Sequence, residues 1–449
     1  MLAAGVLAAC QTGGTGSPVP PPPTAACVVV QDSPRASVTF ALPQAADAAH
    51  APVPRNSSER TIFRQLYQTL VALDCEGRVR PAIAASWSAD DSGRVWHFRL
   101  NRAASFWDGT PVTAYAVSDS WTTNSAGAAA IFAAVNAIDE GSLRVELHSP
   151  AHDPHIFTHP DLAVARRTTT GWPVGTGSFV VTQTGDPRVL RLVRRDEAQV
   201  LEFRTFEATD SRSALDAGVD LLVASDAAAL EYARALANYS AVPLRWNQMF
   251  GIATRAPASG AAATRPPPAE VLTEFARDAV RADARPSEPP FWFQNAECLN
   301  QSLGTASATN ARGRTIAYPR NDAIARAIAE RIVALAWPRP RSPLWLRELL
   351  PVDYASAGAP SVVGLPENAL PDSLRAGHGL AYVLALPRID ADVCAIAVVA
   401  DPAARVIANS PGLRFTPLLD TRSYLIYRPG IGRVLLDGDG TLRFAGGGS

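Results

Sequence analysis

Strand-like and helix-like hydrophobic patterns alternate along most of this chain, and this alternation limits the folds it can adopt. Residues 36–42 (ASVTFAL) are rich in β-forming side chains, and residues 94–100 (RVWHFRL) alternate with period two, as in a half-buried strand. Between these two runs, the apolar side chains of residues 59–73 recur at helical spacing. The pattern predicts a mixed α/β fold.

The length of the chain requires more than one globular part. At 449 residues and 47% hydrophobic, it exceeds the roughly 250–300 residues at which a single core usually stops growing. The formal charge of −1, from 41 basic and 42 acidic residues, does not favour nucleic acid or an anionic membrane surface as a partner. All the basic residues are arginine, which excludes lysine-dependent chemistry such as a P-loop lysine or a Schiff base.

The first ten residues (MLAAGVLAAC) have the character of a processing segment. They are uncharged, apolar and too short to span a bilayer, and they end in small residues before Cys10. Residues 7–10 resemble the bacterial lipobox, whose cysteine is acylated, although the usual basic start is absent. Residues 11–32 follow as a tether that begins rich in Gly, Ser and Pro. We therefore expect a lipid anchor at Cys10; the alternative is a buried apolar start.

Four further cysteines lack the spacing of a metal site. Cys27, Cys75, Cys298 and Cys394 form no CxxC pair, and export permits disulfides between them. The sequence does not rank the three possible pairings. We favour Cys298 with Cys394, since both lie in the later half, and the alternative is free buried thiols.

A strand, a turn and a capped helix follow one another around residue 108. Asp108 and Gly109 form a turn pair, and Thr113 is a predicted N-cap for a helix that places Val117 and Trp121 on its buried face. Many folds use such a unit, so it does not identify the fold alone.

The order of these units along the chain is more specific. The segments that decide it are QLYQTLV (65–71), DCEGRVRPAIAASW (74–87), DDSGRVWHFRL (90–100), FWDGTPVTAYAV (106–117), WPVGTGSFVV (172–181), residues 203–223 and residues 313–337. In this order they resemble the bacterial extracellular solute-binding proteins of the peptide type, family 5, which supply ABC importers. Tyr115 and Ala116 replace the acidic pair that is usual in the family.

The resemblance implies a two-lobed type II periplasmic binding protein fold of the α/β class. Lobe one would comprise residues 33–255 and 405–449, with an extra subdomain at about 59–170. Lobe two would comprise residues 256–404, where the chain is shortened relative to the family.

It also implies a function without catalysis or cofactor. The chain would be an exported monomer, anchored by lipid and facing the periplasm or the cell exterior. It would capture a small peptide-like solute between its lobes and deliver it to the membrane permease of an ABC importer. The alternative is a cell-surface interaction or structural lipoprotein that keeps the scaffold without a transport ligand.

Four residues are predicted ligand contacts on the same basis. Trp246, Asn247 and Phe250 lie in RWNQMFGIAT, near the predicted passage between the lobes, although ordinary packing between lobes is the competing interpretation. Asp401 lies in a segment that, in peptide-binding relatives, often holds the ligand amine.

Three histidines form a weak metal hypothesis. His152, His155 and His159 would share one face of a helix, but Pro154 and Pro160 interrupt that helix. We favour a solvated face over a metal site.

Two further motifs suggest chemistry that the surrounding sequence does not support. VLLDGDGTLRF (434–444) resembles the nucleophile loop of haloacid-dehalogenase-type phosphatases, yet the chain has no lysine, so we expect a β-hairpin. GWPVGTGSF (171–179) lacks dinucleotide-binding spacing, which favours a glycine-lined turn between the lobes. No GxSxG, HExxH or SxxK motif is present.

Overall fold

The computed structural model of the chain describes residues 27–124, 126–169, 171–182, 186–196, 199–206, 211–255, 269–281, 283–294, 315–336, 361–366, 369–376, 381–388, 402–409 and 413–445. Cys10, Cys298, Cys394 and Asp401 lie outside these residues, so the predictions made for them stay predictions. None of the helices in the described ranges has both the length and the apolar composition needed to cross a bilayer.

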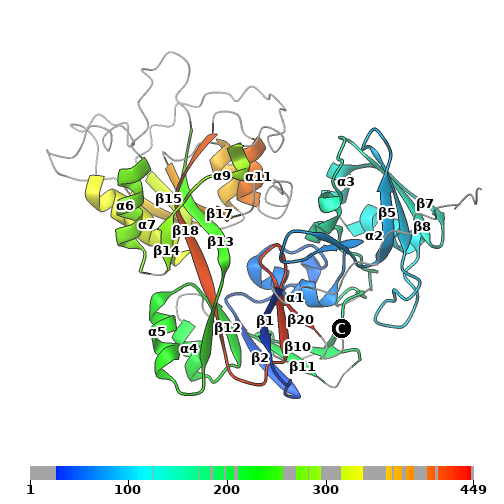
Figure 1. The fold of residues 1–449 in the computed structure, drawn as a ribbon, viewed down its shortest axis with the longest axis horizontal. Coiled ribbons are helices and arrows are strands. Elements are labelled where there is room, and N and C mark those ends of the chain that lie inside the picture. The colour runs from blue at the N-terminus through cyan, green and yellow to red at the C-terminus, as the bar shows by residue number, and fades with distance from the viewer. Residues whose placement is uncertain are drawn as a thin grey trace, which may run out of the picture.

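Two long antiparallel strands, β13 (Ser240–Arg255) and β18 (Leu413–Tyr427), run through both halves of the molecule (Figure 1). They belong to an eleven-stranded sheet. One end of β18 pairs with β12 (Leu221–Ala224), whereas the far end of β13 pairs with β17 (Ala381–Pro387). The two halves are therefore lobes that share continuous strands.

The pairing of β13 with β18 is irregular where the strands pass between the lobes. Its register shifts between Pro243 and Trp246 and again between Trp246 and Gln248. We call residues 243–248 of β13 and 420–424 of β18 the crossing. The predicted lobe limits at 255 and 405 both lie beyond it, inside the second lobe, because a continuous strand shows no change of pattern at the boundary.

The first lobe is built around parallel pairs of β2 (Ser37–Leu42) with β11 (Val200–Thr205) and β12. Alternate residues of β2 face different layers: Phe40 packs with α1 (Ser57–Leu66), and Ala41 packs with α4 (Ser211–Asp216) and α5 (Ala227–Ala235). The remaining strands are β9 (Phe179–Thr182) and β10 (Val189–Arg194) on the main sheet, and β1 (Val28–Gln31), β19 (Arg433–Leu436) and β20 (Leu442–Ala445) in a separate three-stranded sheet.

An extra subdomain extends from the first lobe. Its sheet has the order β5 (Ala84–Ala89), β6 (Val95–Leu100), β8 (Ser142–Leu147) and β7 (Phe132–Asp139), covered by α2 (Ala114–Asn124) and α3 (Ala126–Ile131). Its core runs from Leu70 to Val164, whereas α1 packs in the first-lobe core. The subdomain thus begins after α1 rather than at residue 59. It includes the hairpin β3 (Val71–Leu73) and β4 (Val79–Pro81) and the short 3-10 turns η3 (Pro154–Thr158) and η4 (Pro160–Leu162).

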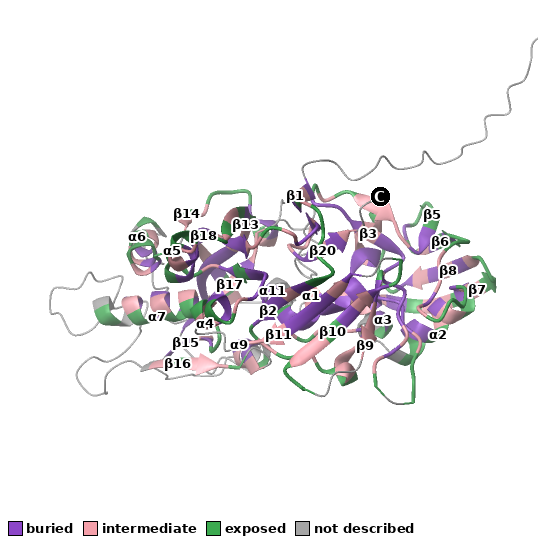
Figure 2. Ribbon diagram, turned by 90° about the horizontal axis from the view of Figure 1, so that it is seen from below, coloured by how far each residue is buried: buried purple, intermediate pink, exposed green. Residues whose placement is uncertain are grey.

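The second lobe has the parallel strands β15 (Thr315–Pro319), β16 (Ser361–Leu365) and β17 between helices. The helices α6 (Ala269–Ala279) and α7 (Ala323–Ala336) pack in one core, and α9 (Leu370–Ala376) and α11 (Pro402–Asn409) pack in another. The short strand β14 (Ala284–Pro286) pairs with β18. Figure 2 shows buried residues concentrated on the shared strands and on α1, and exposed ones around β7.

Local sequence signals are confirmed where the chain is amphipathic. The strand at 94–100 buries Trp96, Phe98 and Leu100. The Oγ1 atom of Thr113 accepts from the backbone N–H of Ala116, so Thr113 caps α2 as predicted. The helix predicted over 59–73 is shorter, because it ends at Leu66 and its last residues form β3 instead.

Candidate functional site

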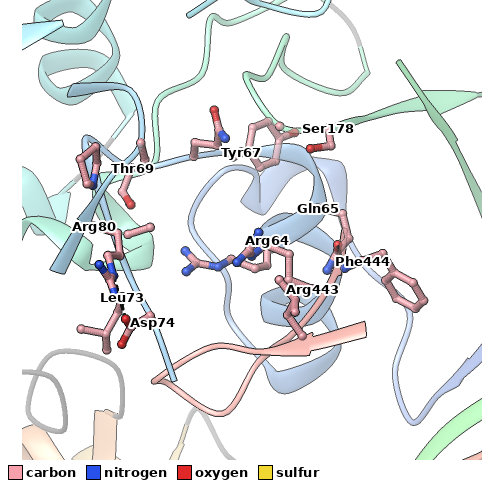
Figure 3. Close-up of a pocket in the computed structure, with 16 residues that line it drawn as sticks. Arg64, Gln65, Tyr67, Thr69, Leu73, Asp74, Arg80, Ser178, Arg443 and Phe444 are labelled. Atoms are coloured by element: carbon pink, nitrogen blue, oxygen red, sulfur yellow. Dashed lines mark hydrogen bonds and ion pairs between the residues drawn. The ribbon is translucent and has the colours of Figure 1, made fainter. Parts of the chain in front are cut away.

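A cavity of about 380 Å³ lies in the first lobe beside α1 (Figure 3). Its walls come from α1, the β3–β4 hairpin, the turn before β9 and the β19–β20 hairpin, so segments far apart in the sequence meet here. The lining residues are Arg64, Gln65, Tyr67, Gln68, Thr69, Ala72, Leu73, Asp74, Arg80, Pro81, Ala82, Gly177, Ser178, Leu435, Arg443 and Phe444.

One wall depends on the close approach of two glycines to the end of α1. A Cβ atom on Gly175 would lie 2.2 Å from the carbonyl oxygen of Leu66, and one on Gly177 would lie 2.2 Å from that of Gln65. The backbone N–H of Gly177 donates to the carbonyl oxygen of Leu66 at 2.8 Å. This glycine turn packs within the first lobe, not between the lobes as expected, and it accounts for the early end of the helix.

A buried carboxylate in the β19–β20 turn holds two arginines. The Nε atom of Arg64 lies 2.7 Å from Asp437, and that of Arg443 lies 3.2 Å from it, while the Asp437 side chain is 2% exposed. Burial lowers the pKa of the Arg64 guanidinium, but Asp437 and Asp439 outweigh burial and raise it overall. Because the turn closes between β19 and β20 as a hairpin and its first aspartate is paired, the β-hairpin prediction is confirmed.

A second carboxylate anchors the opposite wall. Asp74 accepts from the Nε atoms of Arg78 and Arg80, at 3.0 Å and 2.8 Å. Burial raises the pKa of Asp74, but the hydrogen bonds from the backbone of Arg78 and from the two arginine side chains outweigh it, so the pKa is lowered. Asp74 is therefore ionised and fully engaged at neutral pH.

The three arginines that line the cavity share one arrangement. Arg64, Arg80 and Arg443 each use Nε for a carboxylate. Within the described ranges, their Nη atoms have no hydrogen-bond partner, and Nη2 of Arg80 is buried in that state. Figure 3 shows the Arg64 guanidinium directed from α1 toward the side of the cavity that holds Arg80 and Asp74. The Nη atoms of these guanidinium groups can donate hydrogen bonds to an acidic group.

The residues predicted near the crossing do not line this cavity. The Trp246 ring contacts two guanidinium groups, with the Cζ atoms of Arg285 and Arg422 at 4.6 Å and 4.8 Å from its centroid. The Asn247 carbonyl accepts from the Arg388 backbone N–H, while its side-chain Oδ1 atom is buried without a partner among the described residues. Ligand contact by these two residues stays a prediction.

Phe250 is a core residue. It is 1% exposed and packs with α6 and α7 inside the second lobe, not between the lobes as the competing interpretation had it, and it does not line the cavity. The spacing of aromatic residues near a passage between lobes does not distinguish these two environments.

A charge network surrounds the crossing. Asp420 is fully buried and lies 3.3 Å from Nε of Arg388 and 3.5 Å from Nη2 of Arg285, and it accepts from Ser287 Oγ at 2.7 Å. Arg388 also donates to the carbonyl oxygens of Pro290 and Glu288. These arginines link β13, β14, β17 and β18, and they stabilise the second lobe next to the crossing.

The histidine hypothesis is wrong in its geometry. Residues 154–162 form the turns η3 and η4 rather than one helix, because the prolines interrupt it. His155 bonds Asp153 and the Gly77 carbonyl, and His159 is buried, where its Nδ1 atom accepts from the backbone of Asp161. Of the three, only His152 is exposed, so the favoured expectation of a solvated face is wrong for His159, and His155 is half-buried. No cluster of three metal-ligating side chains occurs in the part of the chain that the structure describes.

Cys27 and Cys75 form a disulfide. This bond leaves Cys298 and Cys394 available for the predicted pairing. Cys75 lies in the turn between β3 and β4, and its carbonyl oxygen accepts from the Arg245 side chain of the crossing. The start of the described chain is thereby fixed close to the strands that join the lobes.

Sequence reasoning missed the three cavity arginines. Arg64 lies on an amphipathic helix, Arg80 and Arg443 lie on short strands, and each is typical of a solvated face. The available signal was the placement of Arg443 two residues after the Asp-Gly-Asp-Gly-Thr turn, but its partner Arg64 is far away in the sequence.

Comparisons with known proteins match this architecture. Residues 78–260 match the model for bacterial extracellular solute-binding proteins, family 5 Middle. The periplasmic oligopeptide-binding protein OppA of Escherichia coli K12 is 41% identical over 63 residues, which are 14% of this chain and only 11% of that relative.

Solved structures match over nearly the whole chain. NikA from Brucella suis, in complex with Fe(III)-EDTA, superposes with a TM-score of 0.63 at 14% identity, covering 91% of this chain and 100% of that one. Haemophilus influenzae OppA, in complex with the peptide RPPGFSPFR, gives 0.57 at 13% identity, covering 91% and 97%. These matches confirm the predicted fold class, a two-lobed type II periplasmic binding protein, and the predicted resemblance.

Proposed function

Because residues 78–260 are a family 5 middle region on this two-lobed fold, we propose that the chain is the binding protein of an ABC importer. It captures a small peptide-like solute and delivers it to a membrane permease. The observation that carries this proposal is the pair of strands, β13 and β18, that joins two lobes and supports a hinge motion between them.

The hinge is the crossing. Its shifted register interrupts the regular ladder, and ladder irregularities bend a strand locally. A solute bound in the first-lobe cavity would favour closure by adding contacts to the second lobe, and the closed form would dock on the permease. Trp246 lies in this segment and contacts Arg285 and Arg422, so we expect its surroundings to change when the lobes close.

The proposal includes no catalytic step. The relatives named above are binding proteins, and Asp437, the first aspartate of the phosphatase-like loop, is occupied by Arg64 and Arg443. A paired, buried carboxylate in a hairpin turn is poorly placed to attack phosphorus.

The proposal includes export and anchoring. Acylation of Cys10 would attach the chain to a membrane facing the periplasm or cell exterior, with the tether as a spacer. The tether is shorter than the predicted residues 11–32, because Val28–Gln31 form β1 and pair with β19. The Cys27–Cys75 disulfide supports export, since such bonds persist in oxidising compartments. We expect a monomer that does not bind nucleic acid.

Native mass spectrometry of the exported protein tests this proposal. We expect a discrete added mass that denaturation releases and that identifies the solute. A bare mass that persists after incubation with peptide pools, metal chelates and organic acids would contradict solute binding and favour an interaction lipoprotein.

A further inference from the structure

We infer that the first-lobe cavity takes an anionic solute with at least two acid groups, held by the Nη atoms of Arg64, Arg80 and Arg443. The inference rests on the proposed function, since it names the chemical class of the captured solute. It concerns a compact organic acid or an acidic peptide fragment rather than a cation or a neutral solute.

The first argument is the hydrogen-bonding state of the arginines. Each of the three uses Nε for a protein carboxylate and, within the described ranges, keeps both Nη groups free of protein acceptors. A partly buried guanidinium without acceptors loses hydration energy that only a bound ligand or water restores. One carboxylate binds the two Nη atoms of one guanidinium in a bidentate pair. Three guanidinium groups can therefore bind more than one acid group.

The second argument is the charge of the lining. Three guanidinium groups line the cavity, together with a single carboxylate, that of Asp74. Asp74 is occupied by Arg78 and Arg80 and by the backbone N–H groups of Glu76 and Arg78. The described lining therefore offers no free carboxylate to the ammonium group of a peptide or to a metal ion.

The third argument is the rest of the lining, which limits the size and character of the solute. Leu73, Leu435 and Phe444 provide apolar contact, and the volume is about 380 Å³. This is near the lower end of ordinary ligand pockets, at roughly 300–1,000 Å³, so the lining suits a short carbon skeleton that carries its charges at the ends.

Isothermal titration calorimetry on the purified full chain tests the inference. The probes are citrate, succinate, acetate and inorganic phosphate. We expect citrate to bind with a Kd at or below about 1 mM, acetate to bind far more weakly, and added NaCl to weaken both. Phosphate tests whether a single tetrahedral anion is enough. Tight binding of phosphate in place of citrate would overturn the requirement for two acid groups.

Variants locate the binding. Arg64→Gln and Arg443→Gln are each expected to raise the Kd of the best anion by roughly tenfold to a hundredfold. Arg191→Gln is the matched control, because Arg191 also bonds a carboxylate, that of Glu202, through Nε in the first lobe but lies outside the lining, and it should leave the Kd unchanged. Circular dichroism of each variant shows whether it is folded.

The possible failures separate the two proposals. If no anion binds to the folded protein while a neutral or cationic solute does, the inference about charge is overturned and the binding function stands. If an anion binds but the arginine variants bind it like the wild type, this site is overturned. If no solute of any class binds, the proposed function fails as well.

Discussion

Two arginine clusters in this molecule have the same composition and different hydrogen bonding. At the crossing, Arg388 donates hydrogen bonds from both Nη atoms to backbone carbonyls, and its Nε atom forms an ion pair with Asp420 at 3.3 Å. Beside α1, Arg64 and Arg443 give only Nε to Asp437. The first arrangement ties elements of the fold together, whereas the second leaves cationic donors directed at a cavity. Arg388 and Arg64 therefore differ in the use of the Nη atoms: those of Arg388 are bonded within the fold, and those of Arg64 remain available to a ligand.

The largest effect should come from removing the buried charge at the crossing. Asp420→Ala leaves Arg388 and Arg285 without their carboxylate, so we expect the free energy of unfolding to fall by about 3–5 kcal/mol. Urea denaturation followed by circular dichroism measures this loss. Asp283→Ala is the control, because its side chain is 38% exposed and its loss should cost clearly less. Equal costs would contradict the structural role given to the crossing.

A steric change in the cavity wall ranks second. Gly177→Ala places a Cβ atom 2.2 Å from the Gln65 carbonyl oxygen, and overpacking against backbone typically costs about 1–3 kcal/mol. We expect a lower thermal midpoint and weaker anion binding. Gly141→Ala is the matched control, since the nearest atom to its Cβ would be 3.7 Å away. If Gly177→Ala is as stable as the wild type, the backbone around Gln65 moves to accept the Cβ atom, and the close approach does not constrain the cavity wall.

Substituting one arginine from each cluster sharpens the comparison. Arg443 is 41% exposed and Asp437 retains Arg64, so Arg443→Gln should cost only about 1 kcal/mol of stability or less while weakening anion binding. Arg388→Gln should do the reverse. Thermal unfolding and calorimetry on both variants measure the two effects, and the account fails if both variants lose stability and binding in the same proportion.

The smallest effect concerns an ion pair that depends on pH, unlike the arginine pairs. Burial lowers the pKa of His155, but its bonds to Asp153 and to the Gly77 carbonyl outweigh burial and raise it above the ordinary value of 6.5. The stabilisation is therefore full below about pH 6.5 and is lost as the pH rises through the raised value. We expect a change below about 1 kcal/mol between pH 6 and pH 8 that His155→Gln removes. If the stability difference between wild type and His155→Gln grows as the pH rises, the predicted direction of the pH dependence is wrong.

The sequence predicted what depends on local pattern and on the order of segments. The Thr113 cap, the strand at 94–100 and the hairpin around Asp437 each follow from a few adjacent residues, and all three are present. The family resemblance rested on the order of such units, which tertiary packing does not disturb.

The rest could not be predicted because it depends on contacts between distant segments. The helix after residue 57 stops at Leu66 because glycines more than one hundred residues later pack on its end. The binding arginines come from α1, β4 and β20, and their free Nη atoms become visible only when the partners of Nε are known. The burial of Phe250 likewise follows from α6 and α7, which no local pattern around it reveals.

Small-angle X-ray scattering tests the central claim most directly. The protein is measured alone and then saturated with the solute that native mass spectrometry releases from it. The account predicts that the radius of gyration falls on binding, because the lobes close about the crossing. The part of the tryptophan fluorescence that Trp246→Phe removes should change at the same concentrations, since the chain has nine tryptophans. An unchanged radius with the solute demonstrably bound would contradict a binding protein that works by closure of its lobes.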